Sequence, residues 1–287
     1  MTAMSSYEVR NVKFDVSTLP RYWHGQRKAV TAFFNNLSIF FPAGERFFIA
    51  SVRAHRDAIK DPQLLEDMRT FYGQEGVHTR EHLRYNEALG EQGYPVEAMD
   101  GRVQALLGLV SRVLPARLQL AVTCALEHFT ALIADWLLST PELFDGVDPN
   151  MTALWRWHAA EENEHKAVAF DVFKSIGGTY IERAVIMVLA TIIFWGKVAE
   201  HQVRLMRADN TLFSAAEWGA MLRFLVLRKR GFLSMVPAYF DYFRPSFHPW
   251  DHDNRHLLAA WKEDFERDVL YRASAARAAE RPRPAAA

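Results

Sequence analysis

Apolar residues recur at spacings of three and four along most of this chain, and stretches that alternate apolar and polar residues are few. The first spacing places apolar side chains on one face of a helix, whereas alternation would indicate a half-buried strand. The pattern therefore predicts an all-α protein. Helices are expected over residues 26–40, from about 42 to 59, 62–89, 96–139 with a break at Pro115, 149–175, 181–206, 215–230 and 254–274.

Several residues mark where these helices begin and end. Asp-Pro pairs at 61–62 and 148–149 predict helix starts, because aspartate caps the first free N–H groups and proline fits the first helical position. Pro42 is expected to separate two helices, and Gly90 to end the third.

The chain has 287 residues, of which 50% are hydrophobic and 24% are charged, so it can bury a sizeable core. We expect an irregular N-terminal segment over residues 1–25, a single helical domain over 26–274, and a low-complexity, disordered tail over 275–287.

Charge and cysteine content exclude several classes of function. Lys plus Arg and Asp plus Glu number 34 each, so no overall positive field indicates a nucleic-acid partner. The single cysteine, Cys124, excludes intramolecular disulfides and a cysteine metal cage, and it fits a reducing compartment. The first twenty residues lack a basic start followed by an apolar run, so we expect no secretory signal and a cytoplasmic protein.

The most apolar stretch is Ala184–Gly196, thirteen residues bounded by Arg183 and Lys197. A helix of this length is too short to cross about 30 Å of hydrocarbon. We expect a buried core helix. The alternatives are an interfacial helix in peripheral contact with a membrane and the wall of a channel for an apolar substrate.

Four of the expected helical stretches each carry a glutamate on a face that is otherwise largely apolar. Glu45 and Glu127 stand alone, whereas Glu75 and Glu162 are each followed three residues later by a histidine, His78 and His165. Side chains at positions i and i+3 share one face of a helix, so each of the two pairs offers an oxygen and a nitrogen to the same ion. Buried carboxylates are rare unless they are paired or bind a metal.

The order Glu, ExxH, Glu, ExxH is that of a four-helix bundle that binds two metal ions in its core. The six proposed metal ligands are Glu45, Glu75, His78, Glu127, Glu162 and His165. Carboxylate oxygens combined with two imidazoles suit two iron ions, with manganese or zinc as alternatives.

The sequence around these ligands resembles a known family. FPAGERFF, QEGVHTREH, ALEHFTA and AAEENEHKAVAFDV are similar to the bacterial family labelled "predicted metal-dependent hydrolase", over roughly residues 15 to 270. The ligand set also resembles the ferritin-like di-iron carboxylate superfamily. The resemblance implies a ferritin-like four-helix bundle with additional flanking helices.

The same resemblance assigns roles to residues beside the ligands. Gln74 and Glu161 match the positions from which an amide or an acid binds a metal-ligating histidine of the partner helix. His82 and His158 lie one turn from His78 and Glu162 on the ligand face. Each is a candidate seventh ligand, a candidate proton donor or a core histidine. Tyr72 is a candidate for electron or proton transfer.

Two functions follow from these residues. The ligand pattern favours a di-iron oxidase or oxygenase that acts on O2 and a small apolar substrate, with an electron donor protein as partner. The family label instead implies a binuclear metal-dependent hydrolase. A metal-storage or purely structural bundle is a third reading, which the length of the chain disfavours. The sequence leaves the oligomeric state open.

Overall fold

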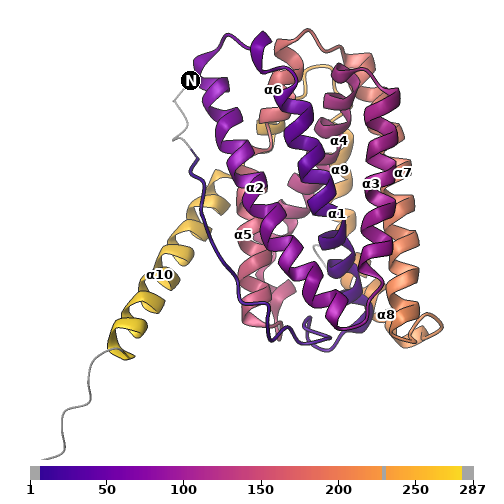
Figure 1. The fold of residues 1–287 in the computed structure, drawn as a ribbon, viewed down its shortest axis with the longest axis vertical. Coiled ribbons are helices and arrows are strands. Elements are labelled where there is room, and N and C mark those ends of the chain that lie inside the picture. Colours follow the sequence, from indigo (N-terminus) through magenta and orange to yellow (C-terminus); the bar gives the residue numbers. More distant parts are fainter. Residues whose placement is uncertain (1–6, 228–230, 280–287) are drawn as a thin grey trace, which may run out of the picture.

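The computed structural model describes residues 7–227 and 231–279, with side chains described for 7–227 and 231–267. Within these ranges the protein is all-helical, apart from one isolated β-bridge between His24 and Val147 (Figure 1). The all-α prediction is confirmed. The α-helices are α1 (Lys28–Arg53), α2 (Pro62–Glu91), α3 (Val96–Val113), α4 (Ala116–Ser139), α5 (Pro149–His165), α6 (Val168–Ser175), α7 (Tyr180–Ala208), α8 (Ala215–Leu222), α9 (Val236–Asp241) and α10 (Arg255–Ala279).

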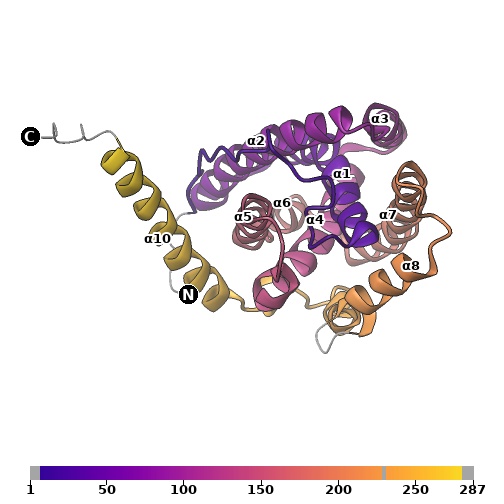
Figure 2. The same ribbon diagram turned by 90° about the horizontal axis from the view of Figure 1, so that it is seen from below.

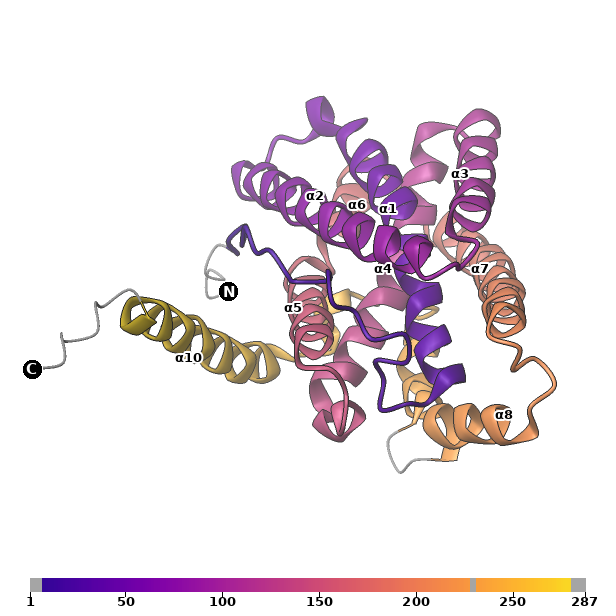
Figure 3. The same ribbon diagram turned by 60° about the horizontal axis from the view of Figure 1, so that its bottom comes forward.

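The long helices pack in a bundle. α1 packs against α2, α4 packs against α5, and α7 lies against both α1 and α4. α3 flanks α1 and α2, and α10 contacts α5 and α4 before it projects away from the body of the molecule (Figures 1 and 2). The N-terminal segment, residues 7–27, runs along the outside between α2 and α5 (Figure 3).

Pro42 does not separate two helices as expected, because α1 continues through it to Arg53. Proline lacks an N–H group, so the carbonyl of Ser38, four residues earlier, loses its partner within the helix. Asn86 on α2 replaces that partner, since its Nδ2 donates to Ser38 O over 3.0 Å. The side chain of Asn86 therefore satisfies the carbonyl that Pro42 leaves without a partner, and α1 can continue through the proline.

Other boundaries also differ from the predictions. The capping role of Asp61 and Asp148 is confirmed, but α2 runs past Gly90 to Glu91, and Gly93 makes the following turn with φ of 88°. The helix expected over 149–175 is interrupted at residues 166–167, which divides α5 from α6 directly after His165.

The C-terminal third carries further differences. The helix expected over 215–230 ends at Leu222, is followed by a π-helical turn, Arg223–Leu227, and its last three residues lie outside the described part. α9 was not expected. α10 runs five residues beyond the predicted Ser274, and the rest of the expected tail lies outside the described residues.

The apolar run 184–196 lies within α7 and is buried on one face only. Ile186 and Met187 are buried, whereas Val185 and Ile192 are 53% and 67% exposed. The expectation of a buried core helix is therefore wrong for half of this stretch.

Of the described helices, α4 is long and apolar enough to cross a membrane, but 67% of its most apolar window is buried inside the fold, as is usual for a core helix.

Candidate metal centre

The structure brings the six proposed ligands to one point inside the bundle. α1 supplies Glu45, α2 supplies Glu75 and His78, α4 supplies Glu127, and α5 supplies Glu162 and His165. Each of the six residues is at most 2% exposed. Three groups among the buried acids and histidines bring their ligand atoms within 4.8 Å of one another, and together these groups contain all six residues and His158.

Glu75 and Glu162 lie at the middle of the cluster and face both histidines. The two oxygens of Glu75 lie 3.6 Å from His78 Nδ1 and 3.4 Å from His165 Nε2. The two oxygens of Glu162 lie 3.5 Å from His78 Nδ1 and 3.7 Å from His165 Nε2. Each carboxylate thus offers one oxygen to either side, which is the arrangement of a bridging ligand.

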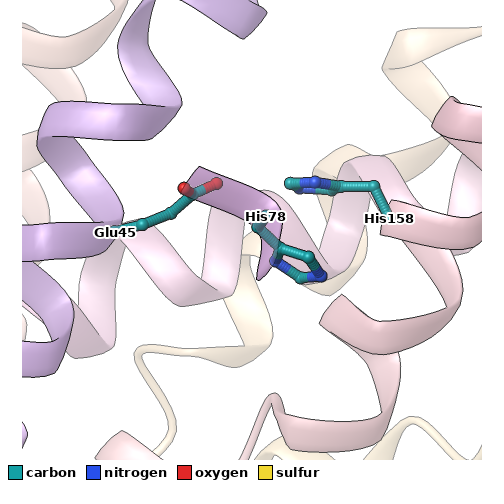
Figure 4. Close-up of side chains that lie close together, drawn as sticks. All are labelled: Glu45, His78 and His158. Atoms are coloured by element: carbon teal, nitrogen blue, oxygen red, sulfur yellow. The ribbon is translucent and has the colours of Figure 1, made fainter. Parts of the chain in front are cut away.

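Glu45 and Glu127 belong to opposite ends of the cluster. Glu45 groups with His78 and His158, and Figure 4 shows its carboxylate directed toward these two rings from the facing helix. Glu127 groups with Glu75 and His165, with 3.6 Å between Glu127 Oε2 and His165 Nε2. The geometry therefore offers two adjacent sites that share Glu75 and Glu162.

The polar atoms that face one another in this cluster have no hydrogen-bond partner. The unpartnered buried atoms here are Glu45 Oε1, both oxygens of Glu75 and of Glu127, Glu162 Oε2, His78 Nδ1, His158 Nε2 and His165 Nε2. Leaving so many buried polar atoms unsatisfied would cost on the order of 10 kcal/mol in total, at about 1–3 kcal/mol for each group. Cations between them would satisfy these atoms, so the donor set fits metal ions.

Protonation provides only a partial alternative. Burial raises the pKa of Glu45 and Glu127 well above the usual value, and the neighbouring charges of Glu75 and Glu162 raise it further. Burial acts on Glu162 in the same direction, but the imidazoles of His158, His165 and His78, which lie 3.1–3.7 Å from its oxygens, hold its pKa well below the usual value. The cluster therefore concentrates negative charge at Glu162 between the two ends.

A chain of hydrogen bonds determines which nitrogen of His158 carries its proton. Because Asn86 Nδ2 donates to Ser38 O, Asn86 Oδ1 accepts from Ser38 Oγ over 2.8 Å. Ser38 Oγ then accepts from His82 Nδ1 over 2.9 Å. Burial and the charge of His158 lower the pKa of His82 well below its usual value. His82 is therefore neutral, and its Nε2 accepts a hydrogen bond.

His158 is consequently the donor to His82, through Nδ1 over 3.0 Å. Burial and the charge of His78 lower the pKa of His158 to about 4, so its Nε2 carries a lone pair. That lone pair faces Glu162 Oε1 at 3.1 Å. Two lone pairs repel at this distance unless a cation lies near both, which favours a ligand role for His158 over that of a proton donor. His82 lies behind it and orients its ring.

The two candidate ligand histidines, His78 and His165, each accept or donate a hydrogen bond on the side away from the cluster, to a residue of the partner helix. Glu161 Oε2 lies 3.1 Å from His78 Nε2, and Gln74 Oε1 lies 3.0 Å from His165 Nδ1. These are the positions that the sequence suggests. Such contacts orient an imidazole and increase its basicity as a ligand. They also leave Nδ1 of His78 and Nε2 of His165 directed at the cluster.

Sequence reasoning missed the group that joins these two contacts. Arg10 of the N-terminal segment donates to Glu161 Oε1 over 3.1 Å and to both oxygens of Glu164 over 2.8 and 2.6 Å. Glu164 in turn accepts from Gln74 Nε2 over 2.8 Å. One buried guanidinium thus supports both histidines, through Glu161 on one side and through Glu164 and Gln74 on the other.

No pattern marks Arg10 in the sequence, because its contacts join residues about 150 positions apart. Two observations explain its placement. A Cβ atom at Gly73 would collide with Val9, so glycine lets the segment approach α2 closely. Arg10 also lies 5.1 Å from the ring of Trp261 near the start of α10.

Tyr72 contacts Arg53 and Phe71, and its proposed role in electron or proton transfer stays a prediction.

A cavity of about 330 Å³ adjoins the cluster, between α1, α3, α4, α5 and α7. Its inner end is formed by Glu45, His158 and Glu162. Apart from these three residues, Thr130 and Lys197, its lining side chains are apolar or aromatic, or are absent at Gly44. The cavity leads from the candidate metal ligands toward the surface, and its size is typical of small-molecule sites.

The sharing of Glu75 and Glu162 predicts distinct metal contents for single variants. Glu75→Ala and Glu162→Ala should each lose both ions, whereas Glu45→Ala and Glu127→Ala should each lose one. Mass spectrometric metal analysis of the purified proteins measures the ratio. Glu66→Ala, an exposed glutamate on α2 that pairs with Arg69, is the control and should keep both ions. Full metal content in Glu75→Ala and Glu162→Ala would refute this ligand set.

The contacts of Arg10 predict an effect on metal affinity without contact to the metal. Arg10→Met leaves the buried carboxylates of Glu161 and Glu164 without a counter-charge, so metal affinity should fall about 10–100-fold. Competition with a fluorescent chelator measures this change. Lys13→Met removes an exposed charge from the same segment and should leave the affinity unchanged. Equal affinities for the two variants would contradict the supporting role of Arg10.

Comparison with known proteins agrees with a metal-binding function. A family model described as "Predicted metal-dependent hydrolase" matches residues 8–253, which include Arg10, all six proposed ligands and the cavity. No curated protein and no solved structure matches the chain. The match extends over most of the sequence, and the chain therefore belongs to the family of predicted metal-dependent hydrolases.

Proposed function

We propose that the protein is a dinuclear metal-dependent hydrolase whose substrate carries an apolar chain. The observation that carries this proposal is the position of the cavity. Its walls are apolar, and its inner end is formed by Glu45, His158 and Glu162 of the candidate metal centre. A substrate whose apolar chain fills the cavity would place its polar end at these residues. Membership of the family supports hydrolysis as the reaction.

Metal ions held by Glu45, Glu75, Glu127, Glu162 and the histidines would polarise a carbonyl group and lower the pKa of water. The chain itself supplies position and a dry environment. The apolar walls exclude bulk water and align the chain of the substrate. Thr79 Oγ1 donates to Glu45 Oε2 over 2.7 Å, which orients the carboxylate, and Glu45 Oε1 remains free of hydrogen bonds at the inner end. That oxygen is therefore the one left to hold a metal ion.

Hydrolysis of p-nitrophenyl esters with acyl chains of graded length tests the proposal. Each additional buried methylene contributes about 0.8 kcal/mol, so kcat/KM should rise about fourfold per methylene until the cavity is filled. Activity should disappear on chelation and return with added metal. Rates that ignore chain length, or that survive complete metal removal, would contradict the proposal.

Two substitutions on α3 separate the cavity from general effects on the fold. Val110→Trp narrows the cavity and should lower kcat/KM for long acyl chains while short chains keep their rate. Gln104→Trp changes an exposed position of the same helix outside the lining and should leave the chain-length profile unchanged.

The donor set favours one second candidate, a di-iron oxidase or oxygenase. Four carboxylates and three imidazoles on helices of a bundle are hard ligands that suit iron or manganese, and this arrangement resembles a ferritin-like core. The substrates would then be O2 and the same apolar chain, with a donor protein supplying electrons. O2 consumption by the reduced, iron-loaded protein, together with an absence of ester hydrolysis in every metal form, would favour this candidate over hydrolysis.

A further inference from the structure

α3 and α7 present apolar side chains to the outside of the molecule. On α7 these are Ile181, Val185, Val188, Leu189, Ile192 and Ile193, all between 44% and 67% exposed. Most of them are three or four residues apart, so they form a stripe along one face of the helix. On α3, Leu109 and Val113 are 52% and 62% exposed. We call these eight side chains the α3–α7 face.

The cavity opens within this face. Leu109 and Val113 of α3 and Leu189 and Ile193 of α7 line the cavity and are also exposed. The opening is therefore bordered by both helices, and the apolar surface of the protein is continuous with the apolar walls that lead to the metal centre. A cavity that admits a water-soluble substrate does not need apolar residues around its opening, and exposed apolar area is costly in water.

Ion pairs lie at both ends of the face and carry an excess of positive charge. Arg117 pairs with Glu182 at the beginning of α7, over 2.5 Å. Near the other end Glu200 lies within 3.2 Å of Arg102, Lys197 and Arg204. Four basic side chains thus share two carboxylates around an apolar centre. Apolar residues bordered by Lys and Arg are typical of surfaces that lie on an anionic lipid bilayer.

We infer that the α3–α7 face docks on a bilayer with anionic headgroups, and that the apolar chain of the substrate passes from the lipid directly into the cavity. This inference rests on the proposed function, because it names the source from which that site receives its substrate. The apolar chain of the substrate does not cross water on this path, because the mouth of the cavity lies against the hydrocarbon of the bilayer. A second copy of the protein on this face would instead cover the mouth and block entry.

Vesicle binding tests the docking surface. The full-length, metal-loaded protein should sediment with vesicles of phosphatidylcholine and phosphatidylglycerol, and less so as the anionic lipid is removed or the salt concentration is raised. The double variant Val185→Glu/Ile192→Glu changes two exposed residues outside the cavity lining and should reduce the bound fraction at least tenfold. Leu83→Glu, which places a glutamate at an exposed leucine of α2, away from this face, is the control and should bind like the wild type.

Activity and oligomeric state complete the test. The double variant should hydrolyse a short soluble ester at the wild-type rate but a long-chain ester embedded in vesicles at least tenfold more slowly. Soluble-ester activity without vesicle binding by the wild type would overturn the docking and leave the proposed function intact. Vesicle binding that depends on Val185 and Ile192, without hydrolysis of any ester, would support the docking and refute the proposed function. A wild-type dimer that the double variant converts to monomers would also overturn the docking.

Discussion

The structure depends on the burial of more carboxylate and imidazole acceptors than its own hydrogen bonds can satisfy. Glu75 and Glu127 have no partner for either oxygen, and nitrogens of His78 and His165 face them across the same small volume. An apolar bundle would be more stable without these groups, and cations between them would satisfy them. The long helices α1, α2, α4 and α5 provide the rigid frame that keeps them in place.

Support for the cluster comes from residues that contact no ligand oxygen. Arg10 supports both candidate ligand histidines at once, which links the N-terminal segment to the candidate metal centre. On the opposite side, Pro42 frees a carbonyl that orients Asn86, and the resulting chain through Ser38 and His82 directs the lone pair of His158 toward Glu162. The irregular N-terminal segment and Pro42 thereby help to orient the imidazoles of the candidate metal centre, although neither contacts it directly.

The sequence predicts the elements and the candidate site better than their surroundings. Helical periodicity and the Asp-Pro starts indicate the bundle, and the i, i+3 spacing indicates which acids and histidines share a face. These are local signals. The continuous α1 depends on Asn86 from another helix, and the role of Arg10 depends on contacts across the chain, so neither can be read from neighbouring residues. The exposure of Ile192 likewise depends on which helix lies opposite, because an apolar run looks the same whether it faces a core or the outside.

Diffraction from crystals of the metal-loaded protein, measured at the absorption edge of the bound metal, tests the central claim most directly. The account predicts two anomalous peaks about 3.5–4 Å apart. One should lie between Glu45 and His78 and the other between Glu127 and His165, with Glu75 and Glu162 in contact with both. A single ion, or ions bound away from these residues, would contradict it.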